Sequence, residues 1–215
     1  MVKVGLIGIG YWGKNHLRVL RQLRDEGLID QIVCCDTNEV ALKRAKKHDN
    51  IEVEKNWKKL LEDESLDMVT IAAPTPLHYS MSKLFLEAQK DVLVEKPMAM
   101  TVEECEDLIQ ISKERNAGLM VGHIFRFHPA ILELKKRVDY GEFGDILYII
   151  IKRQTLTAPR KDMGVMLALG IHEVDLTCFI LGDQEPDSIF ADLNKYFTNR
   201  EEMALIIQKF GNTTA

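Results

Sequence analysis

The chain has 215 residues, of which 46% are hydrophobic and 28% are charged, as is usual for a folded globular protein. Its 28 lysines and arginines are outnumbered by 33 aspartates and glutamates, so the formal net charge is -5, and no basic tract is present. This balance argues against nucleic acid or an acidic membrane as a partner. The longest apolar runs are strand-sized, and the N-terminus leads straight into a strand without a charged leader. We therefore expect a cytoplasmic protein.

A hydrophobic strand over residues 4–7 leads directly into a GxGxxG motif made by Gly8, Gly10 and Gly13. In this pattern Gly8 permits a tight turn, Gly10 lets the backbone approach a pyrophosphate, and Gly13 lets the next helix pack closely. The anion then lies at the N-terminus of that helix. Glycines at this spacing also occur in a strand, turn and helix that bind nothing, so the motif needs support from the rest of the chain.

After a predicted helix with a leucine stripe, a buried strand is predicted over residues 31–36. Asp36 closes that strand 23 positions after Gly13, close to the separation at which a carboxylate meets the ribose hydroxyls of NAD. A carboxylate there would repel the 2′-phosphate of NADP, and no arginine follows it at once, so the sequence favours NAD over NADP. The alternative is that Asp36 only caps the next helix.

Strands and helices continue to alternate through the first half of the chain. Further strands are predicted over residues 51–53, 68–73, 91–94 and 118–122, and further helices over residues 40–48, 57–61, 77–89 and 101–116. This order describes a parallel, doubly wound sheet, in which ligands collect at the carboxyl ends of the strands. We therefore expect an α/β Rossmann domain over residues 1–121.

The four cysteines, Cys34, Cys35, Cys105 and Cys178, show neither CxxC spacing nor a pairing pattern. Because neighbours in a strand point to opposite faces, Cys34 and Cys35 cannot both serve one site. Buried free thiols are the expected state. No cluster of histidine, cysteine and carboxylate has the spacing of metal ligands, so no metal is expected.

The second half differs in character. Helices are predicted over residues 129–138 and 165–181, and strands over residues 146–152, 188–197 and 204–210. The longer strands and less regular connections predict a second, α+β domain over residues 122–215, with an open, largely antiparallel sheet. Residues 211–215 read as a turn after a strand that has no return partner, which would leave a strand edge exposed.

Glu95, Lys96 and Pro97 follow the strand predicted over residues 91–94. Lys96 is therefore placed at the carboxyl edge of the sheet, where a nicotinamide ring would lie. A lysine there can hydrogen-bond a reacting hydroxyl, and burial beside a positively charged ring disfavours its own charge, which makes it a possible proton acceptor. The alternative is a surface lysine in a turn fixed by proline.

Taken together, the motifs GLIGIGYWGKNH, APTPLHY, VEKPMAMT, GHIFRFHP and GIHEVD resemble the Gfo/Idh/MocA oxidoreductases in order and spacing. The resemblance covers essentially the whole chain. The combination of EKP after a GxGxxG domain with GxHxxD in a second domain is far more specific than any one motif. The GYWG and GHxxRFHP forms are most similar to the nucleotide-sugar branch, which includes UDP-N-acetylglucosamine 3-dehydrogenases and related UDP-hexuronate oxidases.

The resemblance implies a cofactor site and two catalytic residues. The positions that match the family's dinucleotide site are Gly8, Gly10, Tyr11, Trp12, Gly13, Asp36, Ala73, Thr75, His78, Glu95 and Lys96. Lys96 would touch both the nicotinamide ribose and the substrate hydroxyl. His172 matches a second-domain histidine that acts as acid or base on that hydroxyl. Arg126 matches a position that often faces substrate, although an arginine flanked by aromatic residues is also often structural.

The chain departs from the family pattern in two places. Many relatives have an aspartate four residues before the histidine, where this chain has Ala168. Asp175 shares that helix face, but it matches a structural position. Relatives also usually continue well beyond residue 215, which leaves three alternatives: a truncated gene product, a partner that covers the sheet edge, or a second domain unlike that of the family.

The resulting hypothesis is an oxidoreductase that acts on a sugar, with NAD favoured over NADP as its cofactor and a nucleotide sugar as the favoured substrate. Arg126, Arg153 and Arg160 are candidates to meet its phosphates. A homo-oligomer, dimer or tetramer, is expected through the sheet of the second domain. The alternative from another class is a dinucleotide-binding sensor or interaction protein without turnover, which Ala168 favours and the presence of Glu95, Lys96 and His172 disfavours.

Overall fold

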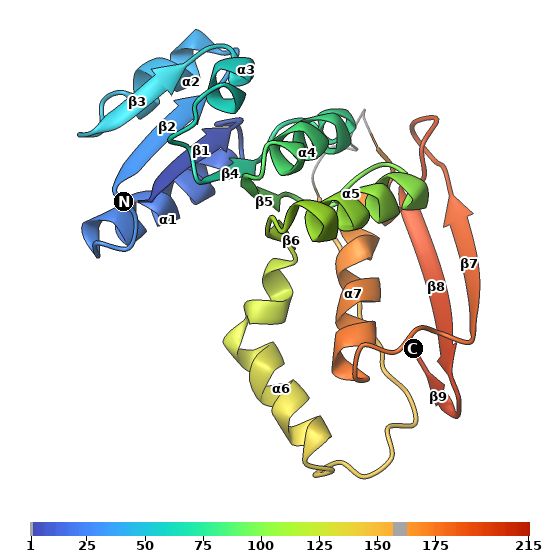
Figure 1. The fold of residues 1–215 in the computed structure, drawn as a ribbon. Helices are drawn as coiled ribbons and strands as arrows, with labels where there is room; N and C mark the ends of the chain where they lie inside the picture. Colours follow the sequence, from blue (N-terminus) through green and yellow to red (C-terminus); the bar gives the residue numbers. More distant parts are fainter. Residues whose placement is uncertain (1, 157–162) are drawn as a thin grey trace. The chain divides into compact units, whose positions relative to one another are not determined.

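The computed structural model describes residues 2–156 and 163–215, and Figure 1 shows its helices and strands. The chain divides into two compact units, Met1–Gly122 and His123–Ala215. This division falls one residue after the boundary expected from the sequence. No helix in the described part of the chain combines the length and the apolar character that a bilayer crossing requires.

The first unit is built on a six-stranded parallel sheet. Its strands are β1 (Lys3–Ile7), β2 (Gln31–Cys35), β3 (Ile51–Glu54), β4 (Met68–Ile71), β5 (Asp91–Val94) and β6 (Leu119–Val121). They lie in the order β3-β2-β1-β4-β5-β6, and each of these pairings is parallel (Figure 1). This order confirms the predicted doubly wound sheet. Its topological switch point lies between β1 and β4, so the loops that follow these two strands border the expected ligand site.

Helices pack on both faces of this sheet. They are α1 (Gly13–Asp25), α2 (Glu39–Ala45), α3 (Trp57–Leu61), α4 (His78–Glu87) and α5 (Val102–Arg115), with a short 3-10 helix η1 (Thr75–Leu77) before α4. One buried cluster joins β1 and β2 to α1 and α2 through residues such as Leu6, Leu17 and Leu42. The other joins the opposite face to α4 and α5 through residues such as Phe85 and Leu108. Because the central strands are buried on both faces, their sequences are nearly continuous apolar runs.

Strand β2 shows how its residues alternate between the two faces. Ile32 and Cys34 belong to the cluster with α1 and α2, whereas Val33 and Cys35 belong to the opposite cluster. The two cysteines are therefore free, buried and directed to opposite faces, as predicted. Burial is the main cause that raises the pKa of each thiol to about 12, so both thiols stay protonated and unreactive.

The second unit combines helices with a small antiparallel sheet. It contains a 3-10 helix η2 (Ile124–Phe127), α6 (Pro129–Asp139), a π-helical segment η3 (Met166–Gly170), α7 (Ile171–Ile180), and strands β7 (Ser188–Asn194), β8 (Met203–Phe210) and β9 (Thr213–Thr214). The sheet has the order β7-β8-β9, and both pairings are antiparallel. Figure 1 shows β7 and β8 as a long hairpin. The predicted α+β class of this unit is confirmed.

The prediction of a strand over residues 146–152 is wrong. Within the described residues this segment makes a single isolated bridge, between Tyr148 and Thr214. The N–H of Ile149 donates to the carbonyl of Thr214 at 2.9 Å, and the N–H of Thr214 donates to the carbonyl of Leu147 at 3.1 Å. The alternating apolar residues fit a strand, but a strand also needs a partner. Strand β9 is two residues long, so it offers too few backbone groups for a ladder.

The helix predicted over residues 165–181 consists of two parts. The first part is the π-helical segment η3, and α7 continues from it. Single turns of π-helix are rare and are often found at functional sites. Here the π-helical turn comes directly before His172 on α7.

Candidate cofactor and catalytic site

The three glycines of the loop after β1 have different surroundings. Gly8 has a φ of +89°, and a Cβ built on it would lie 2.5 Å from the carbonyl oxygen of Ala72. A Cβ on Gly13 would lie 1.9 Å from the carbonyl oxygen of Gly8, whereas a Cβ on Gly10 would have no atom within 4 Å. The packing of the loop therefore requires Gly8 and Gly13. It does not require Gly10, and open space beside the backbone is what the close approach of a pyrophosphate needs.

Helix α1 begins directly after this loop. Its first turn carries no acidic residue, and Trp12 at the N-cap position makes no side-chain hydrogen bond to the helix. Tyr11 and Trp12 are 85% and 40% exposed. No carboxylate or capping side chain competes for the positive end of the helix dipole, so this end suits an anion. The loop and the helix terminus together fit the pyrophosphate of NAD.

Asp36 follows β2 and is half-buried. Its Oδ2 accepts a hydrogen bond from the N–H of Ile9 at 2.6 Å, and its Oδ1 accepts one from the N–H of Asn38 at 2.8 Å. Asn38 is in turn the N-cap of α2. The carboxylate thus links the glycine loop to Asn38, and it is the side chain of Asn38, not that of Asp36, that caps α2. Each carboxylate oxygen can accept more than one hydrogen bond, so contact with the ribose hydroxyls stays a prediction.

His78 joins the turn after β4 to the turn after β5. Its side chain is 1% exposed, with Nδ1 2.8 Å from the carbonyl oxygen of Pro97 and Nε2 2.9 Å from that of Ala73. Thr75 is also buried, in the turn between the two. His78 therefore holds together two turns at the carboxyl edge of the sheet, where its role is structural in the described contacts. Direct contact of Ala73, Thr75 and His78 with the cofactor stays a prediction.

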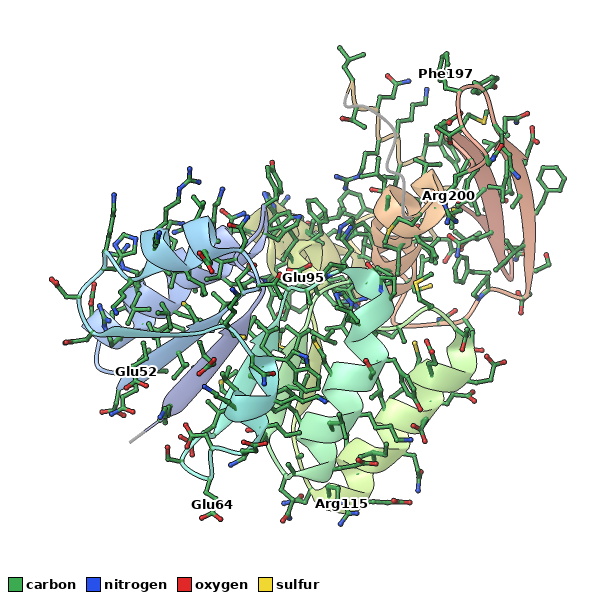
Figure 2. All side chains as sticks on the ribbon, turned by 90° about the horizontal axis from the view of Figure 1, so that it is seen from above. Glu52, Glu64, Glu95, Arg115, Phe197 and Arg200 are labelled. Atoms are coloured by element: carbon green, nitrogen blue, oxygen red, sulfur yellow. The ribbon has the colours of Figure 1, made fainter. Side chains whose placement is uncertain are left out.

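Glu95 joins the turn after β5 to helix α1. It is 7% exposed, and its Oε1 lies 2.7 Å from Nε2 of His16. A Cβ on Gly122 would lie 3.2 Å from the Glu95 carboxylate, so a larger residue there would crowd it. Figure 2 shows Glu95 among the side chains of the first unit, with Glu52 and Glu64 at its rim. His16 was not predicted as a site residue, although its place three residues after Gly13, on the first turn of α1, was an available signal.

Lys96 lies two residues beyond the end of β5 and is half-buried. The peptide bond between Lys96 and Pro97 is cis. Lys96 therefore occupies the carboxyl edge of the parallel sheet, the edge at which ligands bind in this fold class. Its neighbours Glu95 and Pro97 contact His16 and His78 respectively, so the backbone on both sides of Lys96 is held in place.

In the second unit, two carboxylates and an aromatic ring hold Arg126. Its Nε and Nη2 each lie 2.8 Å from Oδ1 of Asp175, and its Nη1 lies 2.8 Å from Oδ1 of Asp183. The guanidinium lies 5.0 Å from the centre of the Phe179 ring. The hydrogen bond to Asp175 is the main cause that raises the pKa of Arg126 above its usual value. These contacts favour a structural role for Arg126, and its contact with substrate stays a prediction.

Arg153 and Arg160 were also predicted to meet the phosphates of a nucleotide sugar. Arg153 donates from Nε to Glu173, and its guanidinium lies 4.5 Å from the centre of the Phe125 ring. A guanidinium with a carboxylate partner is a weaker candidate for binding phosphate. Arg160 lies outside the described residues.

His172 lies in the first turn of α7 and is 6% exposed. Its ring meets the ring of Phe125 edge to face, with the ring centres 4.9 Å apart. Ala168 is also buried, in the π-helical segment before α7. Asp175 pairs with Arg126 and also lies 3.4 Å from Nδ1 of His123, so its carboxylate already has partners within this unit. These contacts agree with the structural interpretation of Asp175.

Two family models match the chain. A model described as an oxidoreductase family with an NAD-binding Rossmann fold matches residues 2–123, and a model of the GFO/IDH/MocA C-terminal domain matches residues 131–215. The chain belongs to the Gfo/Idh/MocA oxidoreductase family. The resemblance noted in the sequence is thereby confirmed, and the first unit is the NAD-binding Rossmann domain of this family.

Relatives within the Gfo/Idh/MocA family act on different sugar alcohols by name. The chain is 29% identical to a UDP-N-acetylglucosamine 3-dehydrogenase from Acidithiobacillus ferrooxidans over 99% of this chain and 64% of the relative. It is 28% identical to a myo-inositol 2-dehydrogenase from Thermotoga maritima over 89% of this chain and 58% of the relative. A crystal structure of a proposed myo-inositol dehydrogenase from Sinorhizobium meliloti has the same fold, with a TM-score of 0.89 at 24% identity, covering 100% of this chain and 68% of that one. The chain thus spans about three fifths of the length of these curated relatives.

Proposed function

We propose that this Gfo/Idh/MocA protein is an NAD-dependent dehydrogenase that oxidises a secondary alcohol of a sugar. The observation that carries the proposal is the loop after β1, where packing requires Gly8 and Gly13 but leaves open space beside Gly10. The sugar class is supported by relatives named as dehydrogenases of UDP-N-acetylglucosamine and of myo-inositol. Within that class we favour a nucleotide sugar such as UDP-N-acetylglucosamine, because the GYWG and GHxxRFHP forms of the motifs are most similar to that branch.

Oxidation of a secondary alcohol to a ketone removes one hydride from carbon and one proton from the hydroxyl. Bound NAD supplies the hydride acceptor. The chain would then need to orient the alcohol and accept its proton. We assign the hydrogen bond to the reacting hydroxyl to Lys96, at the carboxyl end of β5, and the acceptance of its proton to the buried His172 on α7.

Ala168 is the residue that argues against oxidation of a substrate by this protein. Its side chain cannot accept a hydrogen bond, so it cannot replace the aspartate that many relatives have at this position. This gives weight to the second candidate, a protein that binds NAD as a sensor without oxidising a substrate. The two candidates share the first unit and differ only in whether bound NAD is reduced.

The test uses purified protein, NAD and a panel of UDP-sugars and inositols, with the absorbance of reduced nicotinamide as the readout. We expect NADH to form with at least one UDP-sugar, and Lys96→Ala to lower kcat by about a hundredfold or more, since it removes a positioned hydrogen-bonding group. Lys58→Ala, which removes an exposed lysine of α3, is the matched control and should leave kcat unchanged. Tight NAD binding without NADH, together with no effect of Lys96→Ala on any NAD-dependent signal, would establish the sensor instead.

We further propose that the sheet of the second unit mediates a homo-oligomer. One face of the β7–β8 hairpin carries Phe190, Leu205 and Ile207, which are 58%, 48% and 37% exposed. Figure 2 shows Phe197 at the tip of this hairpin. Exposed apolar patches of this kind usually mark contact surfaces. Light scattering after gel filtration should report a dimer or tetramer that Phe190→Lys converts to monomer, and a wild-type monomer at every concentration would refute the proposal.

A further inference from the structure

A pocket of about 290 Å³ lies between α1 and α2 in the first unit, and its wall is strongly basic. Lys14, Arg18 and Arg21 contribute to it from one side, and Arg44 and His48 from the other. The first three are spaced four and three residues apart, so they share one face of α1. No acidic residue lines this pocket, and its volume is near the lower limit of pockets that bind small molecules.

The basic side chains of this pocket have no carboxylate partners within the described residues. Some other lysines of the first unit do have carboxylate partners: Lys3 pairs with Asp63, Lys55 with Glu39, Lys59 with Glu54 and Lys83 with Asp107. Carboxylates are not scarce, because acidic residues outnumber basic ones by 33 to 28. In addition, the Nε of Arg21 is buried and has no hydrogen-bond partner among the described atoms. A buried donor without an acceptor is costly unless a ligand supplies one.

Electrostatics makes an anion the natural ligand of such a pocket. Four positive side chains line one small pocket, and although solvent screens their repulsion at the exposed Lys14, Arg18 and Arg44, a negative charge among them would be favourable. The floor of the pocket includes the buried Leu17 and Ala45, which leaves an apolar surface beside the charged groups. Phosphoryl groups match lysines and arginines in charge and in hydrogen-bonding geometry. An apolar floor beside them suits the organic part of a small phosphorylated molecule.

We propose that this pocket binds the phosphoryl group of a small phosphorylated molecule. The phosphoryl group has two possible sources. Ile9 lines the pocket and also donates its N–H to Asp36, so the pocket adjoins the predicted adenosine end of the cofactor site, and a 2′-phosphate of NADP is one source. A separate phosphorylated metabolite or inorganic pyrophosphate is the other. The proposal does not depend on the dehydrogenase activity, because binding alone tests it.

The experiment measures binding to the full chain by isothermal titration calorimetry at low ionic strength. The probes are inorganic pyrophosphate, added with NAD in excess so that the loop after β1 is not available to it, and NADP and NAD added separately. The pocket variant is Arg18→Gln with Arg44→Gln. The matched control is Lys43→Gln with Lys47→Gln, which removes the same charge from exposed residues in or just after α2 that do not line the pocket.

We expect wild type to bind one pyrophosphate per chain, and the pocket variant to weaken that binding about tenfold or more, because two charge-assisted contacts are lost. The control should change it less than about twofold. If the pocket variant weakens NADP but not NAD, the phosphoryl group is that of the cofactor. If it weakens pyrophosphate alone, the site takes a separate ligand. Pyrophosphate binding that does not saturate, or that the control weakens as much as the pocket variant, would overturn the proposal whether or not the protein proves to be a dehydrogenase.

Discussion

Two glycine substitutions in the same loop should separate folding from cofactor binding. In Gly13→Ala the new methyl group would lie 1.9 Å from the carbonyl oxygen of Gly8, which is backbone and cannot swing aside. In Gly10→Ala the new methyl group would meet no atom within 4 Å, and Gly10 is not among the residues with positive φ. The chain thus tolerates a Cβ at one position and rejects it at the other.

The contact distances set the expected magnitudes. Gly13→Ala should lower the free energy of unfolding by about 3 kcal/mol or more, because the loop or α1 must shift to relieve the overlap. Gly10→Ala should change it by less than about 1 kcal/mol, and the change should tend to be stabilising, since alanine restricts the unfolded chain. The same methyl group would stand where the pyrophosphate approaches, so NAD affinity should fall about tenfold or more, which is about 1.4 kcal/mol.

Urea unfolding followed by tryptophan fluorescence measures the changes in the free energy of unfolding. Both tryptophans of the chain, Trp12 and Trp57, lie in the first unit, so their fluorescence reports on that unit. Calorimetric titration with NAD measures the second. If Gly10→Ala binds NAD as tightly as wild type while unfolding normally, then the open space beside Gly10 is not the pyrophosphate site and the assignment of this loop fails.

Three further predictions concern other contacts of the first unit. His78→Leu should lower the free energy of unfolding by about 1–3 kcal/mol in urea melts, because the buried imidazole N–H that donates to the carbonyl of Pro97 or of Ala73 is lost, and His78→Gln should restore part of it. The hydrogen bond from Lys3 is the main cause that lowers the pKa of Asp63 to about 2. The ionised Asp63 should therefore stabilise the folded state fully above about pH 4, and this contribution should be lost as the pH falls towards 2. The pair is partly exposed, so Asp63→Asn should cost less than about 1 kcal/mol at pH 7 and clearly less at pH 2, and an equal cost at both would contradict this. Asp36→Ser should weaken NAD binding and relax discrimination against NADP in parallel titrations, and an unchanged preference would show that Asp36 acts only as a cap.

The periodicity of the sequence was sufficient to predict the first unit. Parallel strands buried on both faces are short apolar runs, and the helices between them show one apolar side, so each element can be recognised from local sequence. The glycine spacing then predicted a ligand at the loop after β1. The rule that crossover connections between parallel strands are right-handed narrows the possible topologies, but the order β3-β2-β1-β4-β5-β6 was not predicted from the sequence.

The second unit shows where local sequence ceases to be sufficient. Residues 146–152 alternate as a strand does, but a strand also needs a pairing partner, and within the described residues this segment bridges only to Thr214 of the short β9. The π-helical segment before α7 leaves no mark in the apolar pattern, because one extra residue in a turn changes the helix face only slightly. Similarly, the partners of His16 and His78 are 79 and 19 positions away, so no spacing rule identifies these contacts.

Asp36 shows how a residue can combine a structural role with the role predicted for it in ligand binding. Its Oδ1 meets Asn38, the residue that caps α2, and its Oδ2 meets Ile9 in the glycine loop. The same contacts hold the carboxylate at the end of β2, where a ribose would need it. Loss of NAD affinity in Asp36→Ser would therefore combine a lost ribose contact with a displaced loop. Asp36→Asn separates these effects, because the amide oxygen can still accept from Ile9 while the negative charge that repels a 2′-phosphate is gone. If cofactor choice depends on that charge, Asn should relax discrimination against NADP as fully as Ser does while keeping more of the stability of the loop.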